Sequence, residues 1–187
     1  MDQRSLVERA QRGDHDAFAT LVRDAVGRLG PAARLILREP ELARDAVQEA
    51  LILAWRDLPG LRDPDRFDAW LYRLTVNACL GHARRRRRRP IEVEVDAIEM
   101  RASGDFATAL ADHDQLDRAL RQLEPERRAL VVMHIYLGIP LPEVAAQLHI
   151  PLGTAKSRLH RSIAVLRAAV EGEAETPPPI QEQGQLA

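Results

Sequence analysis

The spacing of apolar residues along the chain predicts helices rather than sheet. Apolar side chains recur every three or four residues in several stretches, and glycine or proline separates most of these stretches. In the first half of the chain this pattern predicts helices over about residues 6–10, 18–25, 35–37, 41–58 and 66–89. We expect Gly30-Pro31 to end one of these helices and to separate it from the next one. The second half has the same pattern over about residues 116–123, 126–137, 142–148 and 153–170. The expected fold class is all-α, with two small helical domains.

The limits of the expected domains follow from where the periodicity stops. Residues 1–90 form the first helical domain, residues 91–112 a linker, residues 113–171 the second helical domain and residues 172–187 a disordered tail. Ile91, Val93 and Val95 alternate as in a strand, but they are isolated and lie among acidic residues. A linker is therefore the preferred interpretation.

Composition narrows the class of protein. Of the 187 residues, 45% are hydrophobic and only 4% are aromatic, which agrees with a helical core. No stretch approaches the roughly 18 apolar residues of a membrane span, and the charged N-terminus is unlike a signal segment. Cys79 is the only cysteine, which excludes an internal disulfide and a cysteine-rich zinc site. We expect a cytoplasmic protein without membrane insertion.

No motif of catalysis or cofactor binding is apparent. The six histidines are scattered along the chain, and no HExxH, GxxxxGK[ST] or CxxC arrangement occurs. We therefore expect no catalytic residues, no metal and no cofactor, so an enzyme is the least favoured class.

Charge is strongly segregated, although the formal net charge is only −1. Six consecutive arginines occupy residues 84–89, whereas residues 90–112 carry six acidic residues against a single arginine. A basic block beside an acidic block predicts two different partners, one a polyanion and the other a basic surface.

The second block has the pattern of a helix-turn-helix. Pro142 suits the first turn of a short helix, His149-Ile150-Pro151-Leu152 make a turn, and a second helix begins at Gly153. On that helix an apolar stripe is formed by Ala155, Leu159, Ile163, Leu166 and Val170. The remaining surface carries side chains that suit a major groove, namely Thr154, Lys156, Ser157, Arg158, His160 and Arg161. The alternative is an ordinary amphipathic helix with a solvated charged face.

Two helix faces in the first block have an unusual composition. Over residues 41–58 the side opposite a small-residue stripe presents Asp45, Gln48, Glu49, Ile52 and Arg56, with Trp55 at its edge. An exposed isoleucine among acidic residues indicates a protein-binding face. The next helix carries one stripe of Arg66, Trp70, Arg73, Asn77 and Arg84, followed by Arg85, Arg86, Arg87 and Arg88. Arginines around an aromatic ring suit single-stranded nucleic acid, whose bases stack on the ring. For both faces the alternative is a solvated surface, with Trp70 in the core.

These segments, in this order, resemble the extracytoplasmic-function group of bacterial RNA polymerase sigma factors. The resemblance lies in Asp45-Ala-Val-Gln48-Glu49 running on to Ala54-Trp55, in Arg66-Phe-Asp-Ala-Trp70-Leu-Tyr-Arg73-Leu-Thr-Val-Asn77, and in residues 148–161. It implies that the clamp helices of core polymerase are bound by Asp45, Gln48, Glu49, Ile52 and Trp55. The flap of core polymerase is a second expected contact. It further implies that Arg73, Asn77 and the loop over residues 61–67 hold a flipped base of the promoter −10 element, with the arginine run beside them. The resemblance also implies that the −35 element is contacted by Thr154, Lys156, Ser157, Arg158, His160 and Arg161. An anti-sigma factor is a further expected partner.

The sequence also departs from the family pattern. His149 stands where a glycine is usual, which carries a strain cost if the backbone there is left-handed. Leu51 stands where an aromatic residue is usual. Two functions of different class remain open: a promoter-specificity subunit built from two separate modules, and a stand-alone helix-turn-helix regulator that binds duplex DNA without polymerase.

Overall fold

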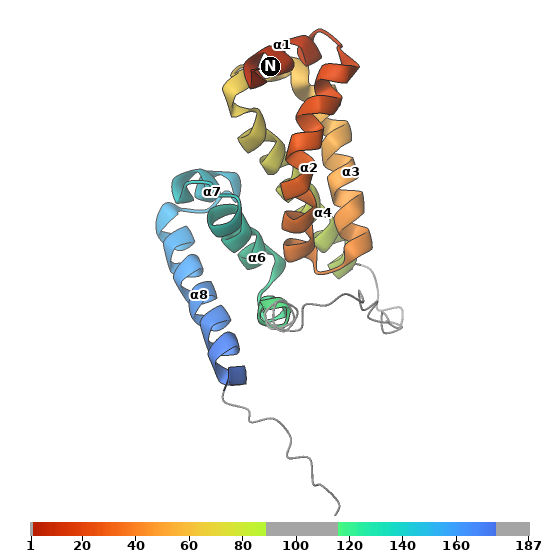
Figure 1. The fold of residues 1–187 in the computed structure, drawn as a ribbon. Helices are drawn as coiled ribbons and strands as arrows, with labels where there is room; N and C mark the ends of the chain where they lie inside the picture. Colours follow the sequence, from red (N-terminus) through yellow and green to blue (C-terminus); the bar gives the residue numbers. More distant parts are fainter. Residues whose placement is uncertain (1, 89–115, 175–187) are drawn as a thin grey trace, which may run out of the picture.

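The computed structural model describes residues 2–88 and 116–174, and within these residues every regular element is a helix (Figure 1). The first block contains α1 (Gln3–Gln11), α2 (His15–Leu37), α3 (Pro40–Asp57) and α4 (Phe67–Arg88). Two short 3-10 turns, η1 (Leu58–Gly60) and η2 (Pro64–Arg66), connect α3 to α4. The second block has a helix over residues 116–121, then α6 (Pro125–Val131), the π-helical turn η3 (Val132–Tyr136), α7 (Leu141–Gln147) and α8 (Leu152–Ala174). The all-α prediction is confirmed for this part of the chain, while the expected linker with its weak strand pattern lies outside it.

Local signals account for the starts of α2 and α3. Asp14 caps α2, because its side chain accepts a hydrogen bond of 2.9 Å from the backbone N–H of Ala17. That bond, together with an ion pair of 2.6 Å to Arg9, lowers the pKa of Asp14. Pro40 occupies the first turn of α3, where its missing N–H costs nothing.

The predicted break at Gly30-Pro31 is wrong. α2 continues through Pro31 to Leu37, although a proline in a helix interior costs about 3 kcal/mol. Leu29, Ala32, Ala33 and Ile36 on both sides of the proline are fully buried, and this burial outweighs the local cost.

Small side chains set the packing of the first block. Ala43, Ala46, Ala50 and Ala54 form the buried stripe of α3, so that this helix lies close against α2 and α4. The opposite side of α3 is consequently left to solvent. The small-residue stripe expected from the sequence is therefore confirmed as the buried side of α3. The predicted protein-binding face lies on the opposite, outward side of the helix.

The two blocks are packed together rather than separate, which the sequence did not indicate. α6 lies beside α2 and α4 (Figure 1), and one apolar cluster runs from the first block into Leu130, Met133 and Val144. Polar contacts that cross this interface include an ion pair of Arg38 with Asp117, an ion pair of 3.2 Å between Arg87 and Glu124, and a hydrogen bond of 3.3 Å from Gln147 Nε2 to the carbonyl of Arg73. We call this contact region the interblock seam.

The end of the second block also differs from expectation. α8 continues to Ala174, so residues 172–174, assigned above to a disordered tail, are helical. None of the helices in the described ranges is long and apolar enough to cross a membrane.

Candidate nucleic-acid and protein interfaces

The outward face of α3 presents the residues that the sequence assigned to it. Asp45 and Gln48 are exposed, and Ile52 is 62% exposed although it is fully apolar. Glu49 is half-buried, because its Oε2 lies 3.0 Å from His82 Nε2 and 3.1 Å from Arg85 Nη2. The face thus keeps a free apolar residue at its centre, while Glu49 also ties α3 to α4.

Trp55 does not stand free at the edge of this face. The ring of His15 stacks on it with centroids 4.4 Å apart, and the edge of Phe18 approaches at 5.0 Å. Both partners come from the first turn of α2, which the sequence analysis had not connected with α3. The exposed aromatic surface here is therefore shared between His15 and Trp55.

The stripe on α4 is partly as predicted. Arg66, which ends η2 just before α4, is exposed, and so are Arg73, Asn77 and all five described arginines of the run, residues 84–88. Trp70 is half-buried against the core, with its ring 6.0 Å from that of Phe67. The sequence had left open a core position for this ring, and its packing limits it to one accessible side.

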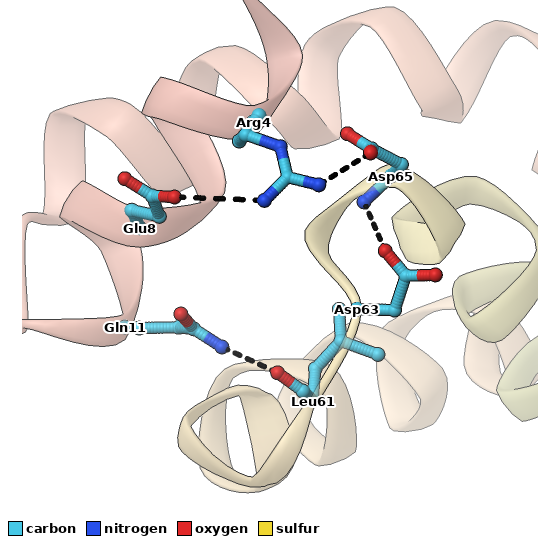
Figure 2. A network of polar contacts seen from close by, with 6 residues as sticks. All are labelled: Arg4, Glu8, Gln11, Leu61, Asp63 and Asp65. Atoms are coloured by element: carbon cyan, nitrogen blue, oxygen red, sulfur yellow. Dashed lines mark hydrogen bonds and ion pairs between the residues drawn. The ribbon is translucent and has the colours of Figure 1, made fainter.

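The loop between α3 and α4 is anchored by α1, as Figure 2 shows. Gln11 Nε2 donates hydrogen bonds of 2.8 Å to the carbonyl of Leu61 and 3.1 Å to that of Leu58. Arg4 forms an ion pair of 2.5 Å with Asp65, which raises the pKa of Arg4. The backbone N–H of Asp65 donates in turn to Asp63 at 3.2 Å. Sequence reasoning missed Arg4 and Gln11, whose spacing of seven residues places them on one helix face.

α7, the turn and α8 form the expected helix-turn-helix. Ala155 at the start of α8 is fully buried, together with Val144 and Ala145 of α7. Lys156, Ser157, His160 and Arg161 are exposed, and Thr154 and Arg158 are half-buried. Arg161 Nε donates a bond of 3.2 Å to the carbonyl of Ser157, which keeps the guanidinium along the helix surface.

The buried side of α8 differs in part from the predicted stripe. Leu159, Ile163 and Leu166 are only half-buried, whereas Ser162 is fully buried and its hydroxyl has no hydrogen-bond partner. The side chain of Val170 is outside the described residues.

Reactive and metal-binding groups are not gathered at these faces. Within residues 2–88 and 116–174, no group of three or more His, Cys, Asp or Glu side chains is placed to hold a metal ion. Burial raises the pKa of the Cys79 thiol to about 12, so that it stays protonated.

Family models and relatives decide between the two open functions. Residues 21–89 match the model of sigma-70 region 2, and residues 113–166 match that of sigma-70 region 4. The chain is 32% identical over 181 residues to the RNA polymerase sigma-H factor of Pseudomonas aeruginosa, covering 89% of this chain and 92% of that one. It is 31% identical over 169 residues to the ECF RNA polymerase sigma-E factor of Escherichia coli, covering 84% of this chain and 88% of that one. The chain belongs to the extracytoplasmic-function (ECF) sigma factors.

Solved structures have the same architecture. This sigma factor matches CnrH, solved in complex with the cytosolic domain of CnrY, at 27% identity with a TM-score of 0.65 over 93% of this chain and 99% of that one. The fold also matches that of the Bartonella quintana sigma factor RpoE, solved with the anti-sigma factor NepR, at 22% identity and a TM-score of 0.66 over 82% of this chain and 96% of that one. The family models and the relatives above show that this protein is an alternative RNA polymerase sigma factor, which is a transcription initiation factor, and a stand-alone regulator is not favoured.

The turn of the sigma region 4 match carries the strain that the sequence anticipated. His149 has a φ of 54°, a left-handed conformation that a residue with a Cβ adopts at a cost. We expect His149→Gly to raise the thermal midpoint of unfolding by roughly 1–4 °C, because glycine removes the backbone strain. The gain is small because glycine loses more backbone entropy on folding than other residues do.

The matched control for this prediction is Gly138→Ala. Gly138 has a φ of 69° and open space around its Cα, so an added methyl group brings strain without a clash. Calorimetry should show a lowered midpoint for Gly138→Ala and a raised one for His149→Gly. Midpoints that move in the same direction would contradict the strain argument.

Proposed function

We propose that three separate faces of this sigma factor divide the work of promoter recognition. The observation that supports this proposal is that each face is exposed on a different helix: Ile52 on α3, Asn77 on α4 and Arg161 on α8. α3 and α4 lie within the region 2 match and α8 begins within the region 4 match. The domains span residues 1–90 and 113–171, with residues 91–112 as the linker.

The α3 face docks the clamp helices of core polymerase. Ile52 provides a central apolar contact, Asp45 and Gln48 surround it with polar groups, and Trp55 with His15 extends the surface. An apolar centre within a polar rim is the usual anatomy of a protein interface. Glu49 contributes mainly by fixing α3 to α4 through His82 and Arg85. The second domain in turn meets the flap of the polymerase.

The α4 face holds the melted −10 element. Arg73 and Asn77 contact an extruded base, while Arg66 and the arginines over residues 84–88 follow the phosphate backbone. The half-buried ring of Trp70 offers one side for stacking. α1 keeps the neighbouring loop in shape through Gln11 and Arg4 (Figure 2).

The α8 face reads the −35 duplex in the major groove. Lys156, Arg158 and Arg161 contact guanine edges or phosphates, and Thr154, Ser157 and His160 add hydrogen bonds. The protein catalyses no reaction of its own and works in the cytoplasm with core polymerase. An anti-sigma factor holds it when it is not in use, in line with the anti-sigma factor seen on the B. quintana sigma factor.

Promoter binding with and without core polymerase tests this proposal. We expect this sigma factor alone to bind a promoter fragment weakly, and to form a salt-resistant complex when core polymerase is added. A gel-shift assay on a library of promoter fragments, followed by run-off transcription, measures both. Tight, core-independent binding to one duplex site would contradict the proposal and support a stand-alone regulator.

A further inference from the structure

A small cavity at the interblock seam is lined by three arginines. Its volume is about 110 Å³, and its polar lining consists of Arg86 and Arg87 of α4 and Arg128 of α6. The apolar part of the wall is formed by Leu37, Leu42, Ala83 and Pro125. Among the residues that the structure describes, no carboxylate belongs to this lining, and the volume corresponds to a few water molecules at about 30 Å³ each. The cavity therefore has room for one small anion.

Arg128 is a buried cation whose Nε–H has no hydrogen-bond partner. It is only 9% exposed, its Nε has no hydrogen-bond partner, and its Nη1 makes one long bond of 3.4 Å to the carbonyl of Leu120. Burial and the nearby Arg38 lower the pKa of Arg128, and Glu124 and Glu126 offset this only in part. A guanidinium in such surroundings favours a bound anion, because buried charges are normally paired.

The other two arginines are held by exposed carboxylates outside the lining. Arg86 pairs with Glu39 at 2.5 Å and Arg87 with Glu124 at 3.2 Å. Side chains this exposed form weak ion pairs, since water screens them. Arg87 can therefore turn part of its hydrogen-bonding capacity to an anion in the cavity, and Arg86 adds positive charge to the lining.

We propose that this cavity binds a small phosphate-containing anion. Guanidinium groups donate paired hydrogen bonds that match the oxygens of phosphate, and three of them converge here from two helices. The apolar wall strengthens the attraction, because it keeps water away from one side of the anion. The source is either a free inorganic phosphate or the terminal phosphates of a nucleotide.

The position of the site gives the anion a consequence. A ligand that touches both α4 and α6 stabilises the packed arrangement of the two blocks. It also occupies Arg86 and Arg87, which the proposed function assigns to promoter DNA. This competition rests on the proposed function, whereas the binding site does not.

Calorimetric titration of the full chain with inorganic phosphate and pyrophosphate, at constant ionic strength, tests the site. We expect one saturable site, with pyrophosphate the tighter ligand. Arg87→Gln and Arg128→Gln should each weaken binding about tenfold or more, since each removes a charged hydrogen bond. Arg84→Gln removes the same charge from the same helix outside the cavity, and it should change the affinity less than about threefold. Arg87 is exposed, so its substitution remains informative if Arg128→Gln fails to fold.

Adenosine triphosphate in a parallel titration distinguishes the two sources. Tighter binding than pyrophosphate indicates a nucleotide, and equal or weaker binding indicates a free phosphate; either result supports the site. The absence of saturable binding beyond a sodium chloride control would overturn the proposal. It would also be overturned if Arg84→Gln weakened binding as much as Arg87→Gln, because the anion would then be attracted by the whole arginine run.

Discussion

Ile52→Asp is expected to weaken binding to core RNA polymerase by at least an order of magnitude while the chain stays folded. Ile52 is 62% exposed at the centre of the α3 face, so a carboxylate there meets no unfavourable burial in the free protein. In the complex the same carboxylate would be buried without a partner. Central interface residues contribute about 2–4 kcal/mol, which corresponds to a loss of roughly thirtyfold to a thousandfold in affinity. Binding of labelled protein to purified core polymerase measures it.

Val26→Asp is the matched control for Ile52→Asp. Val26 is also β-branched, apolar and 39% exposed, but it lies on α2 outside the proposed interfaces. It should bind core polymerase as the wild type does, and both variants should unfold within a few degrees of it. Normal co-purification of the Ile52→Asp chain with the polymerase would reject the α3 face.

Arg161→Glu is expected to reduce transcription strongly from promoters that depend on a −35 element. Arg161 is exposed and lies along the α8 surface beside Ser157, where a major groove would meet it. A good contact to a base or phosphate contributes about 1–3 kcal/mol, and reversing the charge adds repulsion from the backbone. We expect a loss of roughly tenfold to a hundredfold in run-off transcription, with core binding intact.

Arg167→Glu controls for the change of net charge. Arg167 is exposed on the same helix, six residues further along, so that it points to another side. It should retain most of the activity. If Arg161→Glu transcribed as well as Arg167→Glu did, the −35 assignment of this face would be wrong.

The sequence predicted those parts of the fold that depend on a single helix. The alanine stripe of α3 and the polar face of α8 follow from periodicity, because one side of each helix is buried and the other is not. The prediction at Pro31 was wrong because it used only the local rule that proline ends a helix. Burial of the neighbouring residues against other helices outweighs that local cost. Contacts between helices far apart in the chain, such as Trp55 with His15 or α4 with α6, leave no mark on the spacing within either helix.

The candidate faces were predictable to a similar extent. Exposure of Asp45, Ile52, Asn77 and Arg161 followed from helix geometry. The roles of Gln11 and Glu49 did not, because a polar residue on a helix surface has the same pattern whether it meets water or another backbone. The side chain of Gln11 hydrogen-bonds to the backbone of a loop that lies fifty residues further along the chain.

The interblock seam makes promoter recognition depend on a conformational equilibrium. The −10 and −35 elements are about 25 base pairs apart, or roughly 85 Å at 3.4 Å per pair, whereas a compact chain of this length has a radius of gyration of about 16 Å. If α4 and α8 contact these elements as proposed, the packed arrangement of the two blocks is too short to span both. Each factor of ten by which the seam favours association lowers the apparent affinity for a whole promoter by the same factor. Under the proposed function, polymerase that binds the two blocks apart from one another would shift this equilibrium toward the arrangement that reads a whole promoter.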